Sequence, residues 1–180
     1  MPSSGRNESK LKGCLQKIRL LVLDVDGILT DRRIMLDSDG RMVKSFDVQD
    51  GFGLVLARQV GLKTAIITAE RSNIVTLRAK QLKVEWIAQG ARDKGKAFQR
   101  CLRHFHLAPH AVAFMGDDLL DLPVLTRVGF SATVPDAPTE VRERVHYVTR
   151  SHGGRGAVRE VVEFILRTQG HWATILQRYL

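Results

Sequence analysis

Two aspartates that directly follow an apolar run are the residues of this sequence best suited to chemistry. Residues 18–23 are mostly apolar, and Asp24 and Asp26 come next, one residue apart. A run without polar alternation predicts a strand buried on both faces, and open parallel sheets bind ligands at the carboxyl ends of their strands. Buried carboxylates need a compensating cation, and clustered ones favour a hard divalent ion, most often Mg²⁺.

Three further places combine chemically useful side chains with the expected end of a strand or a loop just beyond one. They hold Thr68, then Lys94, then Asp117 with Asp118 and Asp121. Each has an ordinary alternative, because Thr often caps a helix, a lone Lys is usually solvated and Gly-Asp-Asp can be a plain turn. Their common placement at one rim of a parallel sheet favours a joint site with the first two aspartates.

Short apolar runs alternate with amphipathic stretches along the chain. This alternation predicts an α/β fold with a parallel sheet flanked by helices on both faces. The expected strands are residues 18–23, 63–68, 84–87, 111–115, 130–134 and 147–149. The expected helices are residues 50–60, 73–81, 94–104, 119–128 with an interruption near Pro123, and 157–168.

A turn-rich spacer, residues 37–40, separates two short arms and predicts a small β-hairpin flap within residues 31–46. No linker divides the rest. We therefore expect one domain over residues 18–168, a flexible N-terminal lead-in over residues 1–17 and a C-terminal tail over residues 169–180.

Composition limits the partners. The 180 residues have a net charge of +9, but the basic residues are spread along the chain without a Lys/Arg run, which argues against nucleic acid and favours an anionic small molecule. No apolar run is long enough for a bilayer, and the polar N-terminus lacks the apolar centre of a secretory signal. We expect a cytoplasmic protein with no membrane partner.

The order of the four sites resembles the haloacid dehalogenase (HAD) superfamily of phosphotransfer enzymes. The resemblance implies a Rossmann-like HAD fold and a magnesium-dependent phosphoaspartyl mechanism. Asp24 would be the nucleophile and Asp26 the general acid and base, while Thr68 and Lys94 would hold the phosphoryl oxygens. Magnesium would be held by the Asp24 carboxylate, the Asp26 backbone carbonyl and Asp117, with Asp118 and Asp121 behind these ligands.

The segment between the first site, Asp24 and Asp26, and residue 46 is too short for a folded cap domain. Three segments, residues 44–53, 116–123 and 147–160, resemble the 3-deoxy-D-manno-octulosonate 8-phosphate (KDO 8-phosphate) phosphatases, which act in lipopolysaccharide precursor biosynthesis. This resemblance implies a capless homotetramer whose flap and tail help to close sites across subunits. It also implies a set of substrate contacts: Asp26, Asp47, Val48, Gln49, Asp50, Gly51, Arg78 and Lys94.

Several alternatives stay open at this point. Glu70 stands where the octulosonate enzymes usually have Arg, and it resembles phosphatases for nine-carbon keto sugar acid 9-phosphates of the KDN or sialic-acid type; there it would accept hydrogen bonds from sugar hydroxyls. Asp50 could instead cap a helix, and residues 169–180 could simply extend the last helix. A non-catalytic interaction subunit is a further alternative, although every catalytic side chain of the motifs is present.

Overall fold

A six-stranded parallel sheet forms the centre of the molecule. The computed structural model describes residues 11–180, and every strand pair in the sheet, ordered β5-β4-β1-β6-β7-β8, is parallel. The strands are β1 (Leu20–Leu23), β4 (Lys63–Ile67), β5 (Trp86–Ala88), β6 (Val112–Met115), β7 (Phe130–Thr133) and β8 (Tyr147–Val148). The α/β prediction is confirmed, because each predicted strand is present.

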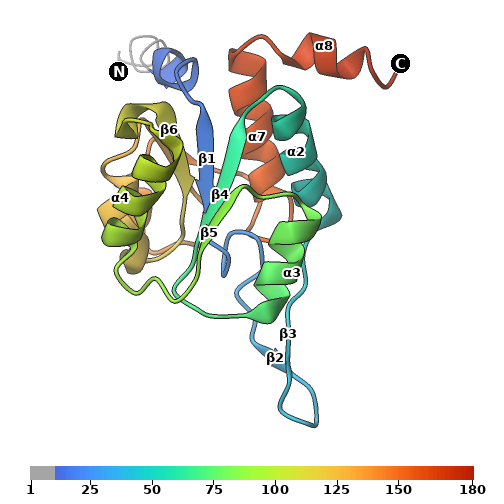
Figure 1. Ribbon diagram of the computed structural model, residues 1–180, viewed down its shortest axis with the longest axis vertical. Coiled ribbons are helices and arrows are strands. Elements are labelled where there is room, and N and C mark those ends of the chain that lie inside the picture. Colours follow the sequence, from blue (N-terminus) through green and yellow to red (C-terminus); the bar gives the residue numbers. More distant parts are fainter. Residues whose placement is uncertain (1–10) are drawn as a thin grey trace.

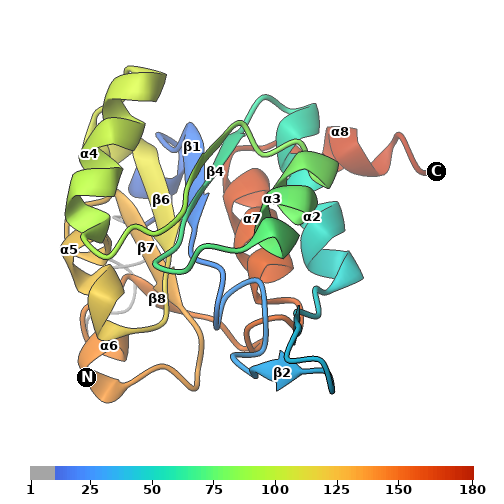
Figure 2. The same ribbon diagram turned by 60° about the horizontal axis from the view of Figure 1, so that its bottom comes forward.

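Helices cover both faces of the sheet (Figures 1 and 2). One face carries α2 (Val48–Gln59), α3 (Asn73–Gln81) and α7 (Ala157–Thr168), and the other carries α4 (Lys94–Phe105) and α5 (Leu122–Leu125). The remaining elements are short: η1 (Pro109–Ala111), η2 (Leu119–Asp121), α6 (Thr139–Arg142) and α8 (Trp172–Leu176). In the part of the chain that the structure describes, no helix is long and apolar enough to cross a membrane.

The register of the central strands explains why distant residues meet. All four residues of β1 are fully buried, as expected for an apolar strand with helices on both sides. Leu23, the last residue of β1, lies between Ile66 of β4 and Met115 of β6. The residues that follow these three positions therefore emerge at the same edge of the sheet.

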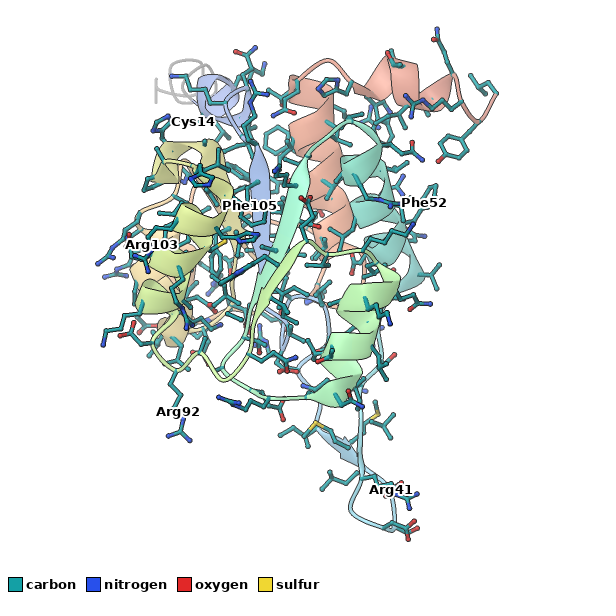
Figure 3. The ribbon with its side chains drawn as sticks, viewed as in Figure 1. Cys14, Arg41, Phe52, Arg92, Arg103 and Phe105 are labelled. Carbon is teal, nitrogen blue, oxygen red and sulfur yellow. The ribbon has the colours of Figure 1, made fainter. Side chains whose placement is uncertain are left out.

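The predicted flap is confirmed as a two-stranded antiparallel hairpin, β2 (Met35–Leu36) and β3 (Met42–Val43). It leaves the carboxyl edge of the sheet and projects away from the body of the protein, with Arg41 at its outer end (Figures 1 and 3). Asp37 accepts hydrogen bonds from the backbone N–H groups of Asp39 and Arg41, which closes the turn.

The prediction of a flexible lead-in over residues 1–17 is wrong for its second half. Residues 11–15 are helical, and Leu15 is fully buried in the core. The Gln169 side-chain amide donates hydrogen bonds to the carbonyls of Leu15 and Ile18, so this segment is bound to the end of α7. The burial of Leu15 holds this segment against the core in spite of its polar composition. Residues 1–10 lie outside the part of the chain that the structure describes.

Candidate active site

A polar pocket of about 300 Å³ lies at the carboxyl edge of the sheet. All four predicted places meet in it. Its lining consists of Asp24, Asp26, Arg32, Thr68, Ala69, Glu70, Lys94, Asp117, Asp118, Leu120 and Asp121. Residues separated by almost a hundred positions in the sequence become neighbours because β1, β4 and β6 are adjacent parallel strands.

Lys94 links two of the buried carboxylates. It is the first residue of α4, and its Nζ lies 2.8 Å from Asp24 Oδ1 and 2.6 Å from Asp121 Oδ1. The other oxygen of Asp121 accepts hydrogen bonds from the backbone N–H groups of Asp117 and Asp118, at 3.0 and 3.2 Å. Asp121 therefore shapes the loop after β6 and orients Lys94, which in turn faces the candidate nucleophile.

Burial makes these carboxylates unstable as bare anions. Burial and the nearby Asp121 raise the pKa of Asp24 to about 8, against the opposing effect of Lys94. Burial also raises the pKa of Asp117 to about 7, although Arg32 acts in the opposite direction. A divalent cation would reverse both preferences, because it stabilises the ionised form of any carboxylate that it contacts.

The carboxylates suit a metal ion. Asp24, Asp117 and Asp121 each offer one oxygen, and these atoms lie within 4.8 Å of one another. Both oxygens of Asp121 are already used by Lys94 and by two backbone amides. Asp24 and Asp117 are therefore the side chains best able to act as ligands, and their oxygen atoms fit a hard cation such as Mg²⁺.

Gly27 allows the turn after β1 to pack closely against the loop that holds Asp117. Its φ is +94°, and a Cβ there would lie 2.0 Å from Asp117 Oδ2. The turn that contains Gly27 is held by Thr30, whose hydroxyl donates to Asp26 Oδ1 at 3.4 Å. The glycine at 27 thus follows from close packing against Asp117, and the threonine at 30 from its contact with Asp26.

Asp26 faces a basic side chain that the sequence analysis did not single out. Lys44, from the end of the flap, donates hydrogen bonds to Asp26 Oδ1 and, at 2.6 Å, to Glu70 Oε2. Its side chain is only 5% exposed. In the sequence, Lys44 is notable only as the first residue of the 44–53 segment that resembles the KDO 8-phosphate phosphatases, and that resemblance gave it no role. Arg32, paired with Asp117, was also missed.

The predicted sugar-binding residues divide into three groups. Glu70 lines the carboxylate pocket together with Asp26 and Lys94. Asp47, Val48 and Gln49 line a separate hollow of about 510 Å³, together with Asp31, Ser45, Phe46, Gly154 and Arg155. Two of the predicted contacts, Asp50 and Gly51, are buried.

Arg78 lies beside the start of α2. It donates a hydrogen bond to the Asp47 carbonyl and stacks over Phe46, and it approaches so closely that a Cβ on Gly51 would lie 2.5 Å from its Nη2. Arg78 is therefore near the second hollow and outside the lining of the carboxylate pocket.

Asp50 has a structural partner instead of a place in either hollow. Its carboxylate accepts hydrogen bonds from the backbone N–H groups of Gly156 and Arg159, at the beginning of α7. The N-cap of α2 is Asp47. Asp50 thus joins α2 to α7, and its contact with substrate stays a prediction. The alternative that Asp50 caps its own helix is wrong.

The family model of the haloacid dehalogenase-like hydrolases matches residues 60–161, more than half of the chain. This chain belongs to that hydrolase family. It is 43% identical over 155 residues to the 3-deoxy-D-manno-octulosonate 8-phosphate phosphatase of Escherichia coli K12, a match that covers 86% of this chain and 82% of the relative.

Solved structures agree with the family assignment. The 3-deoxy-D-manno-octulosonate 8-phosphate phosphatase of Moraxella catarrhalis, in complex with magnesium, phosphate and KDO, superposes with a TM-score of 0.93 at 37% identity and covers 96% of this chain and 99% of its own. The cobalt-bound deoxy-D-mannose-octulosonate 8-phosphate phosphatase of Haemophilus influenzae has a TM-score of 0.84 at 34% identity, and the match covers 87% of this chain and 92% of that one.

Proposed function

We propose that the protein is a magnesium-dependent phosphatase that hydrolyses KDO 8-phosphate to KDO and phosphate, in lipopolysaccharide precursor biosynthesis. The observation that carries this proposal is the contact of Asp24 with Lys94 at the end of β1, in a pocket that also holds Asp26, Thr68 and Asp117. The identity of the relatives, which bear this activity in their names, supports the choice of substrate.

The residues of the pocket divide the reaction into two displacements. In the first, an Asp24 carboxylate oxygen attacks phosphorus, the bond from phosphorus to the sugar oxygen breaks, and Asp26 gives its proton to that oxygen. In the second, Asp26 takes a proton from water, the water oxygen attacks phosphorus, and the bond to Asp24 breaks. The Thr68 hydroxyl and the Lys94 ammonium hold the phosphoryl oxygens.

Magnesium, when bound, neutralises charge on the phosphoryl oxygens and on the two ligand carboxylates. We propose Asp24, Asp117 and the backbone carbonyl of Asp26 as its ligands. Lys94 also favours the ionised form of Asp24, which is the form that can attack. Hydrophobic burial alone would keep Asp24 protonated, so both cations serve the same requirement.

The sugar would extend from the carboxylate pocket toward the mouth beside the flap. Glu70 lies in this pocket and accepts a hydrogen bond from Lys44. It lacks the hydrogen-bond donors that an arginine would offer to the sugar. This observation keeps a nine-carbon keto sugar acid 9-phosphate as the second candidate substrate, because a carboxylate at this place accepts hydrogen bonds from additional hydroxyls. Asp47, Val48, Gln49 and Arg78 stay predicted substrate contacts through the neighbouring hollow. The homotetramer and the cytoplasmic location also stay predictions.

Steady-state hydrolysis of the two sugar phosphates tests the proposal. With Mg²⁺ present, we expect kcat/KM to be higher for KDO 8-phosphate than for the nine-carbon phosphate. The variant Asp24→Asn should lose at least about a thousandfold in kcat, because its amide is no nucleophile, while circular dichroism and the melting temperature show a retained fold. A preference for the nine-carbon substrate would overturn the substrate choice, and release of phosphate from neither compound would favour a non-catalytic subunit.

A further inference from the structure

Arg32, at the root of the flap, holds one of the two carboxylate oxygens of Asp117, a proposed ligand of the metal. Its Nε lies 2.8 Å from Asp117 Oδ2. The Asp117 side chain is 6% exposed and that of Arg32 is 35% exposed, so the pair lies at the inner wall of the pocket mouth. The same guanidinium reaches Asp136, with Nη1 donating to its carbonyl at 2.9 Å and Nη2 lying 3.3 Å from Oδ2.

The backbone of Arg32 is unusual in a way that the fold does not explain. Its φ is +67°, in the left-handed region that side chains with a Cβ rarely adopt. In residues 11–180 the other non-glycine residues with positive φ are Lys83 and His106, and both lie just after the end of a helix, where this conformation is common. Arg32 follows no helix, and its conformation directs the guanidinium to Asp117 and Asp136.

We infer that Arg32 is an internal counterion of Asp117 that competes with a divalent cation for this carboxylate. The inference rests on the proposed function, because it takes Asp117 as a ligand of the metal. A cation that takes Asp117 Oδ2 displaces the Arg32 Nε–H, and one that takes Oδ1 instead binds beside the guanidinium charge. Asp136 gives the displaced guanidinium a second anionic partner, so Arg32 moves along the pocket mouth and stays attached to the protein.

Because the cation competes with Arg32 for Asp117, it binds more weakly than it would to the same ligands without this arginine. Breaking the Arg32 contact opposes binding of the cation, and the nearby positive charge adds repulsion. An ion pair with one partly exposed partner corresponds to roughly a three- to tenfold effect on a binding constant. The same displacement frees one contact of the flap root, so metal occupancy and the position of the flap become coupled.

Calorimetric titration of Mg²⁺ into metal-free protein, without substrate, tests this inference. Arg32→Gln removes the counterion, and Arg33→Gln is the matched control, since Arg33 has the same charge in the same loop but is exposed and lies 3.9 Å from Asp31. We expect the dissociation constant for Mg²⁺ to fall roughly three- to tenfold in Arg32→Gln and to stay near the wild-type value in Arg33→Gln. An unchanged or raised dissociation constant in Arg32→Gln would overturn the inference and would mean that Arg32 instead holds Asp117 in place for the metal.

Thermal unfolding provides a second readout that does not depend on activity. In the presence of a chelator, Arg32→Gln should melt below the wild type, because Asp117 loses its counterion; in saturating Mg²⁺ the two should melt at nearly the same temperature. A melting temperature lowered equally in both conditions would contradict displacement. Asp117→Asn separates the two proposals: if it binds Mg²⁺ as tightly as the wild type, the metal site of the proposed function is wrong, whatever Arg32 does.

Discussion

Lys44 shows how a single side chain from the flap can hold two carboxylates of the pocket together. It lies between Asp26 and Glu70, both partly exposed carboxylates that would otherwise repel each other. Burial lowers the pKa of Lys44, but its hydrogen bonds to Asp26 and Glu70 outweigh burial and raise the pKa above the usual value. Lys44 is therefore charged at neutral pH and connects the flap to the proposed general acid.

Replacing this lysine should impair catalysis more than folding. In Lys44→Met, Asp26 loses a donor that orients it and faces Glu70 without compensation, so we expect kcat/KM for KDO 8-phosphate to fall about a hundredfold. The exposed Lys80 on α3 provides a control, Lys80→Met, that should retain wild-type kinetics. Wild-type kcat/KM in Lys44→Met would show that Lys44 acts only as a structural tie.

At the scale of elements, the junction of α2 with α7 depends on Asp50. The residue before α7, Gly156, has a φ of +95° and offers no side-chain cap. Asp50 provides the missing acceptor from the neighbouring helix, with hydrogen bonds of 3.2 Å from Gly156 and 2.8 Å from Arg159. The contact fixes the loop that ends at α7, and residues 154 and 155 of that loop line the second hollow.

Removal of this buried acceptor should destabilise the protein strongly. We expect Asp50→Ala to lower the free energy of unfolding by about 2–3 kcal/mol, because two backbone donors lose their partner in a buried position. Urea denaturation measures this quantity, and Asp39→Ala in the exposed turn of the hairpin is the control. A loss no larger than that of the control would mean that water replaces the carboxylate without penalty.

The same residue should give stability a distinct pH dependence. Burial raises the pKa of Asp50 to about 6, above its value of about 4 in an unfolded chain. The folded state therefore favours the protonated form. This preference, which is separate from the two hydrogen bonds, stabilises the folded state most below about pH 4 and is lost as pH rises through 6. Relative to Asp50→Asn, the wild type should become less stable between pH 4 and pH 7 in urea denaturation; a constant difference would contradict this.

The flap and the C-terminal tail lie at opposite ends of the molecule. The flap leaves the end that holds the pocket, whereas α8 and the C-terminus lie at the opposite end, beside α2 and α7 (Figure 1). Ile175 of α8 is buried, Trp172 lies under the guanidinium of Arg167, and Tyr179 meets Phe52 of α2 edge to face. The tail is therefore a separate short helix, and it lies far from the pocket of its own subunit, so a plug could act only on a neighbour.

The flap exposes several apolar side chains at the other end, which are Ile34, Met35, Leu36 and Val43. Exposed apolar groups gathered on one projecting hairpin are typical of an interface between subunits, and they support the predicted tetramer. The double variant Ile34→Ser/Leu36→Ser should shift the mass in solution from tetramer toward monomer and lower kcat/KM. Leu77→Ser, which changes an exposed residue of α3, should leave both unchanged. A monomeric wild type by light scattering would refute the tetramer.

The sequence was sufficient for the order of the elements and for the rim of carboxylates. Apolar strands without polar alternation, such as Leu20–Leu23, can be recognised locally because every residue in them is apolar. The helical bounds Asn73–Gln81 and Ala157–Thr168 were predicted without error, since periodic apolar positions and terminal signals lie within each segment. The candidate site residues could be located by their positions after the strands, whereas their predicted roles came from the family resemblance.

Only the tertiary structure decided which charges meet. Lys44 and Arg32 lie in a short flap whose sequence has no period that would point their side chains to Asp26 and Asp117. Asp50 looked like a site residue or a cap of its own helix, and it proved to serve another helix more than a hundred positions away. Local patterns encode burial and helix or strand geometry, whereas ion pairs between distant segments depend on distances that exist only once the sheet has assembled.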